Sequence, residues 1–191
     1  MKLVLGSSSP RRREILASLD LAFDVLAPDV DETRFPDEPA GTYVERIARS
    51  KAKAVSSPDV VVIAADTAVV LEGRVLGKPV HPEEARTMLR RLRGVSHEVL
   101  TGVAISARDE IHSVVESTEV EMEMMTDDEI ASYVDGGEPM DKAGAYALQG
   151  EGGVFVKRVV GSPSNVVGLP VHVLPRLFGR VGLELSQFRS R

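Results

Sequence analysis

The feature that most constrains the fold is the apolar run Val60-Val61-Val62-Ile63-Ala64-Ala65. Its β-branched residues predict a strand that is buried on both faces, as in a parallel sheet covered by helices. The run is the longest apolar stretch in the chain, yet it is far shorter than the ~18–20 residues that a membrane helix needs. We therefore expect a core strand here and no membrane-spanning segment.

The other segments predict strands and helices that alternate early in the chain and strands that pair late in it. This order indicates an α/β or α+β protein with a mixed, strongly curved sheet. Ser9 and Pro10 mark one helix start, and Thr42 with Glu45 forms a predicted capping box. Strands are expected at 2–6, 23–30, 60–65, 68–71, 74–76, 97–107, 111–124 and 154–160, and helices at 10–19, 42–54, 82–93, 126–134 and 170–178.

The length of 191 residues predicts one domain over residues 1–191, or one core split into two lobes by a cleft, with residues 184–191 as a tail. A net charge of −6 does not favour binding to a nucleic-acid polymer or an anionic membrane. The absence of Cys excludes disulfides, thiolate nucleophiles and Cys-based zinc sites. The N-terminal residues lack a secretory signal, so we expect a cytoplasmic protein.

A cluster of hydroxyls and cations lies where the first strand meets the first helix. Ser9, Arg11 and Arg12 belong to the segment Ser7-Ser8-Ser9-Pro10-Arg11-Arg12-Arg13. Free backbone N–H groups, the positive end of the helix dipole and guanidinium groups suit a polyphosphate. The alternative is a capped helix with a solvated basic first turn, although Arg at that position opposes the helix dipole.

Carboxylates lie at the expected ends of two strands. Asp66 follows the apolar run, and the pair Asp31-Glu32 follows the strand expected at 23–30. Such carboxylates serve as metal ligands and general bases, but Asp66 can also cap a turn, and the acidic pair can be solvated loop charge. Lys78, in Gly77-Lys78-Pro79, lacks the spacing of a Walker A motif and on its own is typical of a surface lysine. Together these groups favour metal-assisted phosphate chemistry.

Residues 141–153 form a Gly-rich connector. Its glycines permit close backbone approach to a ligand, and Gln149 offers a donor and an acceptor that suit the edge of a base. The cluster does not match a dinucleotide-binding fingerprint, because no helix pattern opens after it. The four His residues have no metal or triad spacing, and no Gly-x-Ser-x-Gly motif occurs.

Six segments in series resemble the Maf family from residue 3 to about residue 178. They are Leu5-Gly6-Ser7-Ser8-Ser9-Pro10-Arg11-Arg12, Asp31-Glu32, Ala65-Asp66-Thr67, Gly77-Lys78-Pro79, Asp141 to Gly150, and Asn165-Val166-Val167-Gly168-Leu169-Pro170. The resemblance implies a nucleoside triphosphate pyrophosphatase that releases a monophosphate and pyrophosphate. It also implies a two-lobed α/β fold with a curved mixed sheet and a deep cleft, akin to the inosine triphosphate pyrophosphatases.

The resemblance assigns roles residue by residue. Asp66 matches the family's general base and Glu32 its second essential carboxylate. The phosphate-binding positions match Ser9, Arg11, Arg12, Lys51 and Lys78. Three specificity positions, Arg11, Thr67 and Gln149, match the branch that acts on dTTP and UTP, whereas the branch that prefers 7-methyl-GTP usually has Glu in place of Gln149. Gly6 and Ala65 depart from the usual Ala and Gly.

The resemblance further implies a divalent cation, Mg²⁺ or Mn²⁺, which Glu32 and Asp66 would hold. One carboxylate does not comfortably serve as both metal ligand and base, so the division of these roles stays open. Family members are often dimers and are linked to nucleotide-pool cleansing and to arrest of septum formation, so we expect a homodimer that binds a nucleoside triphosphate. Two alternatives are a nucleotide-binding regulatory module of cell division without turnover and a phosphatase that releases orthophosphate.

Overall fold

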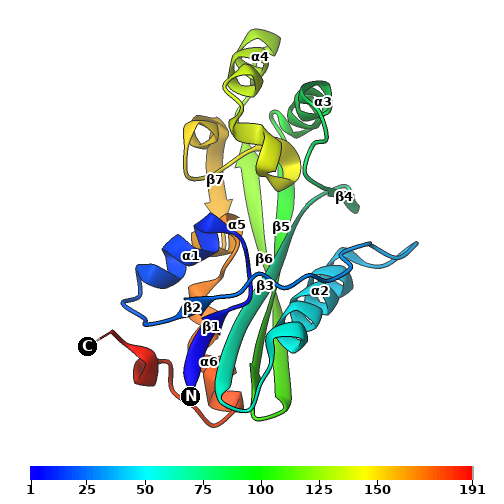
Figure 1. The fold of residues 1–191 in the computed structure, drawn as a ribbon. Coiled ribbons are helices and arrows are strands. Elements are labelled where there is room, and N and C mark those ends of the chain that lie inside the picture. Colours follow the sequence, from blue (N-terminus) through cyan, green and yellow to red (C-terminus); the bar gives the residue numbers. More distant parts are fainter. Residues whose placement is uncertain (191) are drawn as a thin grey trace. The chain divides into compact units, whose positions relative to one another are not determined.

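The computed structural model describes residues 1–190. Its strands are hydrogen-bonded in the order β2-β1-β3-β5-β6-β7, and β4 pairs with β3 off this path (Figure 1). β1 is parallel to β2 and β3, whereas the pairs β3–β4 and β6–β7 are antiparallel. The predicted α/β class with a mixed sheet is confirmed. The strands are β1 (Lys2–Leu5), β2 (Asp24–Val25), β3 (Val60–Leu71), β4 (Arg74–Leu76), β5 (Ser96–Ala107), β6 (Glu110–Met122) and β7 (Val156–Val160).

The helices mostly follow the predicted order. The capping box at Thr42 and Glu45 is wrong: Pro39 takes the N-cap position with ψ 141°, and the helix already begins at Ala40. Helix α5 was not expected, because its five residues are too few to show a periodic pattern. None of the helices in residues 1–190 combines the length and apolar character needed to cross a bilayer. The helices are α1 (Pro10–Ala17), α2 (Ala40–Val55), α3 (Pro82–Leu92), α4 (Asp127–Asp135), α5 (Pro163–Val167) and α6 (Leu174–Arg180).

The central strand is longer than the apolar run that predicts it. β3 continues from Val60 through Asp66 and Thr67 to Leu71, where a hairpin leads into β4. Asp66 therefore lies inside a strand and not at its end, because the second apolar run, Ala68–Leu71, extends the same strand. The backbone that carries this side chain is held by ladder hydrogen bonds both before and after it in the strand.

The chain divides into two compact units, and β3, β5 and β6 contribute residues to both. The first unit comprises Met1–Asp66, Thr101–Glu116 and Gly168–Arg191. Its core joins residues of β1, β3 and β5 to α1 and α6, and Phe178 is fully buried within it. The second unit comprises Thr67–Leu100 and Ser117–Val167, and its core joins α3 and α4 to β3, β5 and β6.

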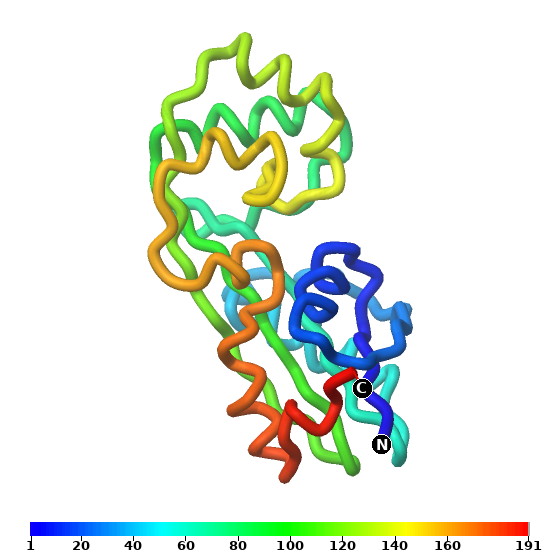
Figure 2. The backbone as a smooth tube through the Cα atoms, turned by 90° about the vertical axis from the view of Figure 1, so that its left-hand side faces the viewer, coloured from blue at the N-terminus to red at the C-terminus, as the bar shows by residue number. Residues whose placement is uncertain are grey.

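The segment after Glu184, expected as a tail, packs on the first unit. Phe188 is only 9% exposed, and its carbonyl accepts a hydrogen bond from the backbone N–H of Ala22 at 2.7 Å. An isolated β-bridge joins Leu21 to Arg189, and Figure 2 shows this red segment beside the blue N-terminal part of the chain. Apolar residues in the last turns thus anchor the segment through burial.

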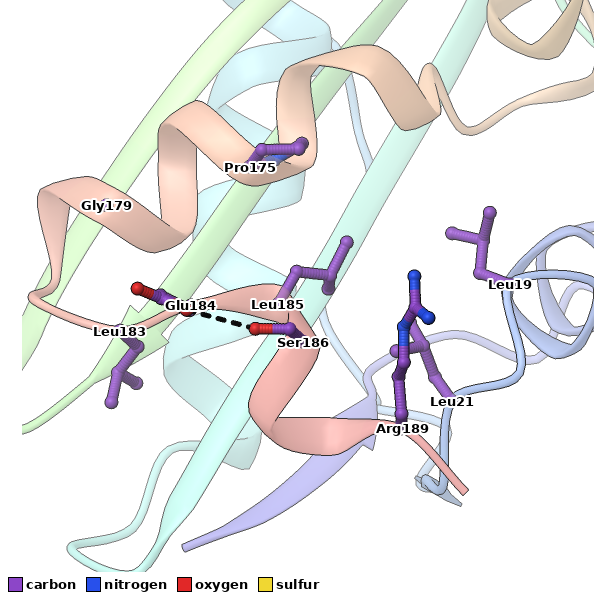
Figure 3. A pocket seen from close by; sticks show the side chains of 9 residues that line it. All are labelled: Leu19, Leu21, Pro175, Gly179, Leu183, Glu184, Leu185, Ser186 and Arg189. Carbon is purple, nitrogen blue, oxygen red and sulfur yellow. Dashed lines mark hydrogen bonds between the residues drawn. The ribbon is translucent and has the colours of Figure 1, made fainter. Parts of the chain in front are cut away.

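A pocket of about 450 Å³ lies on the first unit, beside this C-terminal segment (Figure 3). It contains none of the site residues that the sequence predicts. Leucine side chains line much of it, and the Arg189 guanidinium extends among them. The pocket is lined by Leu19, Leu21, Pro175, Gly179, Leu183, Glu184, Leu185, Ser186 and Arg189.

Helix α2 packs against β3 and β5 within the first unit (Figure 1). Ala48 and Ala52 of the helix are fully buried against small residues of the sheet. At Gly102 of β5 the approach is closest, since a Cβ there would lie 2.3 Å from the carbonyl oxygen of Val44. The sheet therefore accepts only glycine at this position without moving the helix.

Replacing Gly102 with alanine is expected to lower the free energy of unfolding by about 1–3 kcal/mol, because the added methyl group overpacks the α2–β5 contact. Urea unfolding followed by circular dichroism measures the change. Gly179→Ala is the matched control, since nothing lies within 4 Å of a Cβ at that α6 position. Equal stabilities of the two variants would contradict the packing argument.

Candidate active site

Three charged side chains from separate parts of the sequence meet in the first unit. The Nζ atom of Lys51, on α2, lies 2.8 Å from Oδ1 of Asp66 and 2.8 Å from Oε1 of Glu32. Asp66 extends from β3, and Glu32 from the loop between β2 and α2. The Lys51 and Asp66 side chains are each 10% exposed, whereas that of Glu32 is 51% exposed. The structure thus brings together two predicted carboxylates and one predicted phosphate-binding cation.

Burial and charge act in opposite directions on Asp66. Desolvation raises the pKa of its carboxyl above the ordinary value of 3.8, while the ammonium of Lys51 and the charge of Arg12 lower it and Glu32 raises it further. Burial is the largest of these effects. The Asp66 carboxylate is therefore a stronger base than an exposed aspartate, and Lys51 supplies the partner that a buried charge needs.

Arg12 lies within the electrostatic field of the same carboxylates. Burial lowers the pKa of its guanidinium, Asp66 and Glu32 raise it, and neighbouring Arg11 lowers it. Its Nε donates to the carbonyl of Gly168 at 2.8 Å, and its Nη1 donates to Oγ of Ser7 at 3.1 Å. Arg12 is therefore a fixed cation, held close to the two carboxylates.

Ser9 is the N-cap of α1, as predicted, and Pro10 takes the first helical position. The Ser9 hydroxyl accepts from the backbone N–H of Arg12 at 3.5 Å, and the Ser9 N–H donates to Oγ of Ser7 at 3.2 Å. Ser7 is 5% exposed, and its hydroxyl oxygen accepts from both Ser9 and Arg12, so it organises this helix start. The sequence showed Ser7 only as one of three adjacent serines.

The remaining predicted residues, Thr67, Lys78 and Gln149, belong to the second unit. Thr67 is half-buried in β3, and Lys78 is exposed directly after β4. Gln149 is exposed in the Gly-rich connector. The roles of these three residues remain predictions.

The connector that carries Gln149 is shaped by Glu138, which the sequence did not single out. Its carboxylate accepts from the backbone N–H groups of Glu151 and Gly152, each at 3.0 Å, and from the Tyr133 hydroxyl at 2.7 Å. At Gly150, with φ 142°, a Cβ would lie 2.4 Å from Glu138 Oε2. Glycine is favoured here by the positive φ, and a larger residue would also have to displace the Glu138 carboxylate.

A buried histidine holds the other end of the connector. His97 Nε2 lies 2.8 Å from the Tyr146 hydroxyl, and burial lowers the His97 pKa to about 4, so the ring is neutral. The backbone N–H of Gly144 donates to the carbonyl of Gly77 at 3.0 Å, which ties the connector to the segment that bears Lys78. No His spacing in the sequence indicated this role, since the partner is a tyrosine far along the chain.

The donor set suits a hard divalent cation in part. Within residues 1–190 no group of three or more His, Asp or Glu side chains is arranged to hold a metal ion. Glu32 and Asp66 offer carboxylate oxygens, and Mg²⁺ commonly binds one or two carboxylates together with substrate phosphates and water. The pair therefore fits a cation that arrives with a polyphosphate, and Lys51 already contacts one oxygen of each carboxylate.

The sequence pattern of a family described as "Maf-like protein" matches residues 2–181. The chain belongs to the Maf family. A Maf relative from Anaeromyxobacter dehalogenans (strain 2CP-C), named dTTP/UTP pyrophosphatase, is 55% identical over 189 residues, which cover 96% of each chain. One of the same name from Myxococcus xanthus (strain DK1622) is 51% identical over 185 residues, covering 96% of this chain and 94% of the relative.

A solved structure, that of the Staphylococcus aureus Ham1 protein, matches with a TM-score of 0.42 and 18% sequence identity. The match covers 64% of this Maf chain and 72% of the Ham1 chain. Similarity at this level does not bear on the chemistry of the Maf site.

Replacing Lys51 with methionine is expected to raise the Asp66 pKa further, because the ammonium that stabilises the carboxylate is lost while burial stays. As pH rises above about 4, the free energy of unfolding should therefore fall more steeply in this variant than in the wild type. The reason is that the folded variant still binds a proton on Asp66 that the unfolded chain releases. Titration of ¹³C-labelled aspartate by NMR measures the pKa. The control Lys53→Met, at an exposed position of the same helix, should leave the Asp66 pKa unchanged.

Proposed function

We propose that this Maf protein is a nucleoside triphosphate pyrophosphatase that hydrolyses dTTP and UTP to the monophosphate and pyrophosphate. The observation that carries the proposal is the buried Asp66 carboxylate, held by Lys51 beside Glu32 and within the field of Arg12. A basic carboxylate among fixed cations suits attack of water on a phosphate chain. The relatives named dTTP/UTP pyrophosphatase match over nearly their whole length, which supports the substrate class.

In the proposed reaction a water oxygen attacks the α-phosphorus, and the bond from that phosphorus to the oxygen bridging to the β-phosphate breaks. Asp66 orients the water and takes its proton through a carboxylate oxygen. Lys51 contacts Oδ1 of Asp66, which lowers the pKa of the carboxyl against the effect of burial and fixes its orientation. Burial makes the same group basic enough to accept the proton.

The pyrophosphate leaving group gains negative charge as the bond breaks. Arg11, Arg12 and Lys51 are proposed to neutralise it, together with Ser9 at the start of α1 and Lys78 of the second unit. Fixed guanidinium groups suit this task, because they need no reorganisation during the reaction. Arg12 in particular is held by Ser7 and by the Gly168 carbonyl.

We further propose that Glu32 and Asp66 hold a divalent cation, Mg²⁺ or Mn²⁺, that binds together with the nucleotide. Such a cation supplies Lewis-acid polarisation of phosphate oxygens. Glu32, the more exposed of the two carboxylates, is the better candidate for a ligand that exchanges with solvent, and the buried Asp66 is the better candidate for the base.

Replacing Asp66 with asparagine is expected to lower pyrophosphate release by at least about 10²-fold, because general-base catalysis is lost, while nucleotide binding persists. Initial rates with UTP and dTTP measure the loss. Asp59→Asn is the matched control, since Asp59 is an exposed carboxylate just before the same strand. Near-full activity of Asp66→Asn would refute the assignment of the base.

The products decide between the proposed reaction and its alternatives. Phosphorus NMR of wild-type reactions should show a nucleoside monophosphate and pyrophosphate. Stepwise release of orthophosphate would identify a phosphatase instead. Nucleotide binding without any product would identify a regulatory module.

Replacing Gln149 with glutamate is expected to lower kcat/KM for dTTP and UTP by about 5–100-fold. The uracil and thymine edge presents both an acceptor and a donor, and a carboxylate leaves the base carbonyl without its donor. Turnover of 7-methyl-GTP, whose base edge presents N–H donors, should rise relative to UTP. The control Gln187→Glu adds the same charge on the first unit. It should change neither kcat/KM for dTTP and UTP nor the turnover of 7-methyl-GTP relative to UTP.

A further inference from the structure

We propose that Arg46 of α2 is a positioning residue: it fixes the loop that carries Glu32 and so sets the Glu32 carboxylate against Lys51. The inference rests on the proposed function and deepens it, because it names a residue that controls the site without touching the substrate. Arg46 and the residues that it contacts all belong to the first unit.

The strongest contact is a bidentate ion pair between Arg46 and Glu38. Arg46 Nε lies 2.7 Å from Glu38 Oε1, and Arg46 Nη2 lies 2.8 Å from Glu38 Oε2. Glu38 is 7% exposed, and its hydrogen bond to Arg46 lowers its pKa against the opposing effect of desolvation. Bidentate pairs of this kind fix orientation as well as distance, which a lysine does not reproduce.

The same guanidinium also binds the loop close to Glu32. Arg46 Nη2 donates to the carbonyl of Thr33 at 3.0 Å, one residue after Glu32. The Arg46 guanidinium lies 4.1 Å from the centre of the Phe35 ring, and the backbone N–H of Phe35 donates to Glu38 Oε2 at 3.1 Å. One side chain thus contacts the loop at residues 33, 35 and 38.

Tyr43, one helical turn before Arg46, holds Glu32 itself. Its hydroxyl donates to the backbone carbonyl of Glu32 at 3.2 Å. Burial and the charges of Asp66 and Glu32 raise the Tyr43 pKa to about 12, so the phenol stays a neutral donor. Tyr43, Arg46 and Lys51 lie on one helix, so the residues that hold the loop and the ammonium that Glu32 meets share a rigid frame.

Arg49 offers a matched control on the same helix. Its Nη1 donates to the carbonyl of Ile111 at 3.2 Å and to Oγ of Ser113 at 3.0 Å, contacts that do not involve the Glu32 loop. Arg46→Lys and Arg49→Lys therefore make the same substitution on the same helix, one at a guanidinium that contacts the Glu32 loop and the other at a guanidinium that does not.

Kinetics with UTP at saturating Mg²⁺ form the first test. Arg46→Lys should lower kcat about 10–100-fold, the range for residues that orient a functional group, with little change in KM. Arg49→Lys should leave kcat near the wild-type value. In a Glu32→Gln background Arg46→Lys should cost little more, because the group it positions is already gone. Equal effects of the two Lys variants, or an undiminished loss in the Glu32→Gln background, would overturn the proposal.

Hydrogen exchange of the nucleotide-free protein gives a readout that does not depend on turnover. Exchange in peptides covering residues 31–38 should quicken in Arg46→Lys and not in Arg49→Lys. If Arg46→Lys fails to fold, Glu38→Gln, which removes the charge assistance from the pair, replaces it in both tests. Unchanged exchange would overturn the proposal. If the wild type releases no pyrophosphate, the proposed function fails, and the exchange data alone decide whether Arg46 holds the loop.

Discussion

The contact of one ammonium with two carboxylates determines the organisation of the first unit. Without Lys51, the buried Asp66 carboxylate would lose its hydrogen-bonded ammonium partner, and without Asp66, Lys51 would keep only the more exposed Glu32 as its partner. Their 2.8 Å contact therefore requires α2 and β3 to keep a fixed register. The close approach of α2 to Gly102 and the small side chains of Ala48 and Ala52 provide that register.

Helix α2 combines a packing face and a functional face. Val44 and Ile47 are fully buried, so the helix cannot rotate without exposing them. Its polar positions hold the loop through Tyr43 and Arg46, and the carboxylates through Lys51. The spacing of these three residues is a consequence of helix geometry, which explains how a long loop with little secondary structure presents Glu32 at a defined place.

The sequence predicted the carboxylates but not the frame that holds them. Asp66 and Glu32 follow strands that the sequence predicts, although β3 continues past Asp66 and β2 already ends at Val25, and Ser9 is indicated because Ser-Pro marks a helix start. Lys51 was identified only through the family resemblance, since a lysine on a helix is usually solvated and its 15-residue separation from Asp66 leaves no local pattern. The sequence did not indicate Arg46 and Glu38 either, because their pairing depends on the path of a Pro-rich loop.

The charge balance of the site differs from that of the chain. Lys51 and Arg12 balance Glu32 and Asp66, and the charge of Arg11, which also acts on Arg12, brings the five groups to a net charge of +1 in a protein of net charge −6. Burial lowers the Arg12 pKa, and the two carboxylates raise it, so anions already compensate the cation before any ligand binds. A nearly neutral cluster avoids the self-repulsion that bare cations would impose on the fold. It also suits a triphosphate that brings its own divalent cation, because the incoming charge is then largely neutralised and the cluster needs only a small surplus of positive charge.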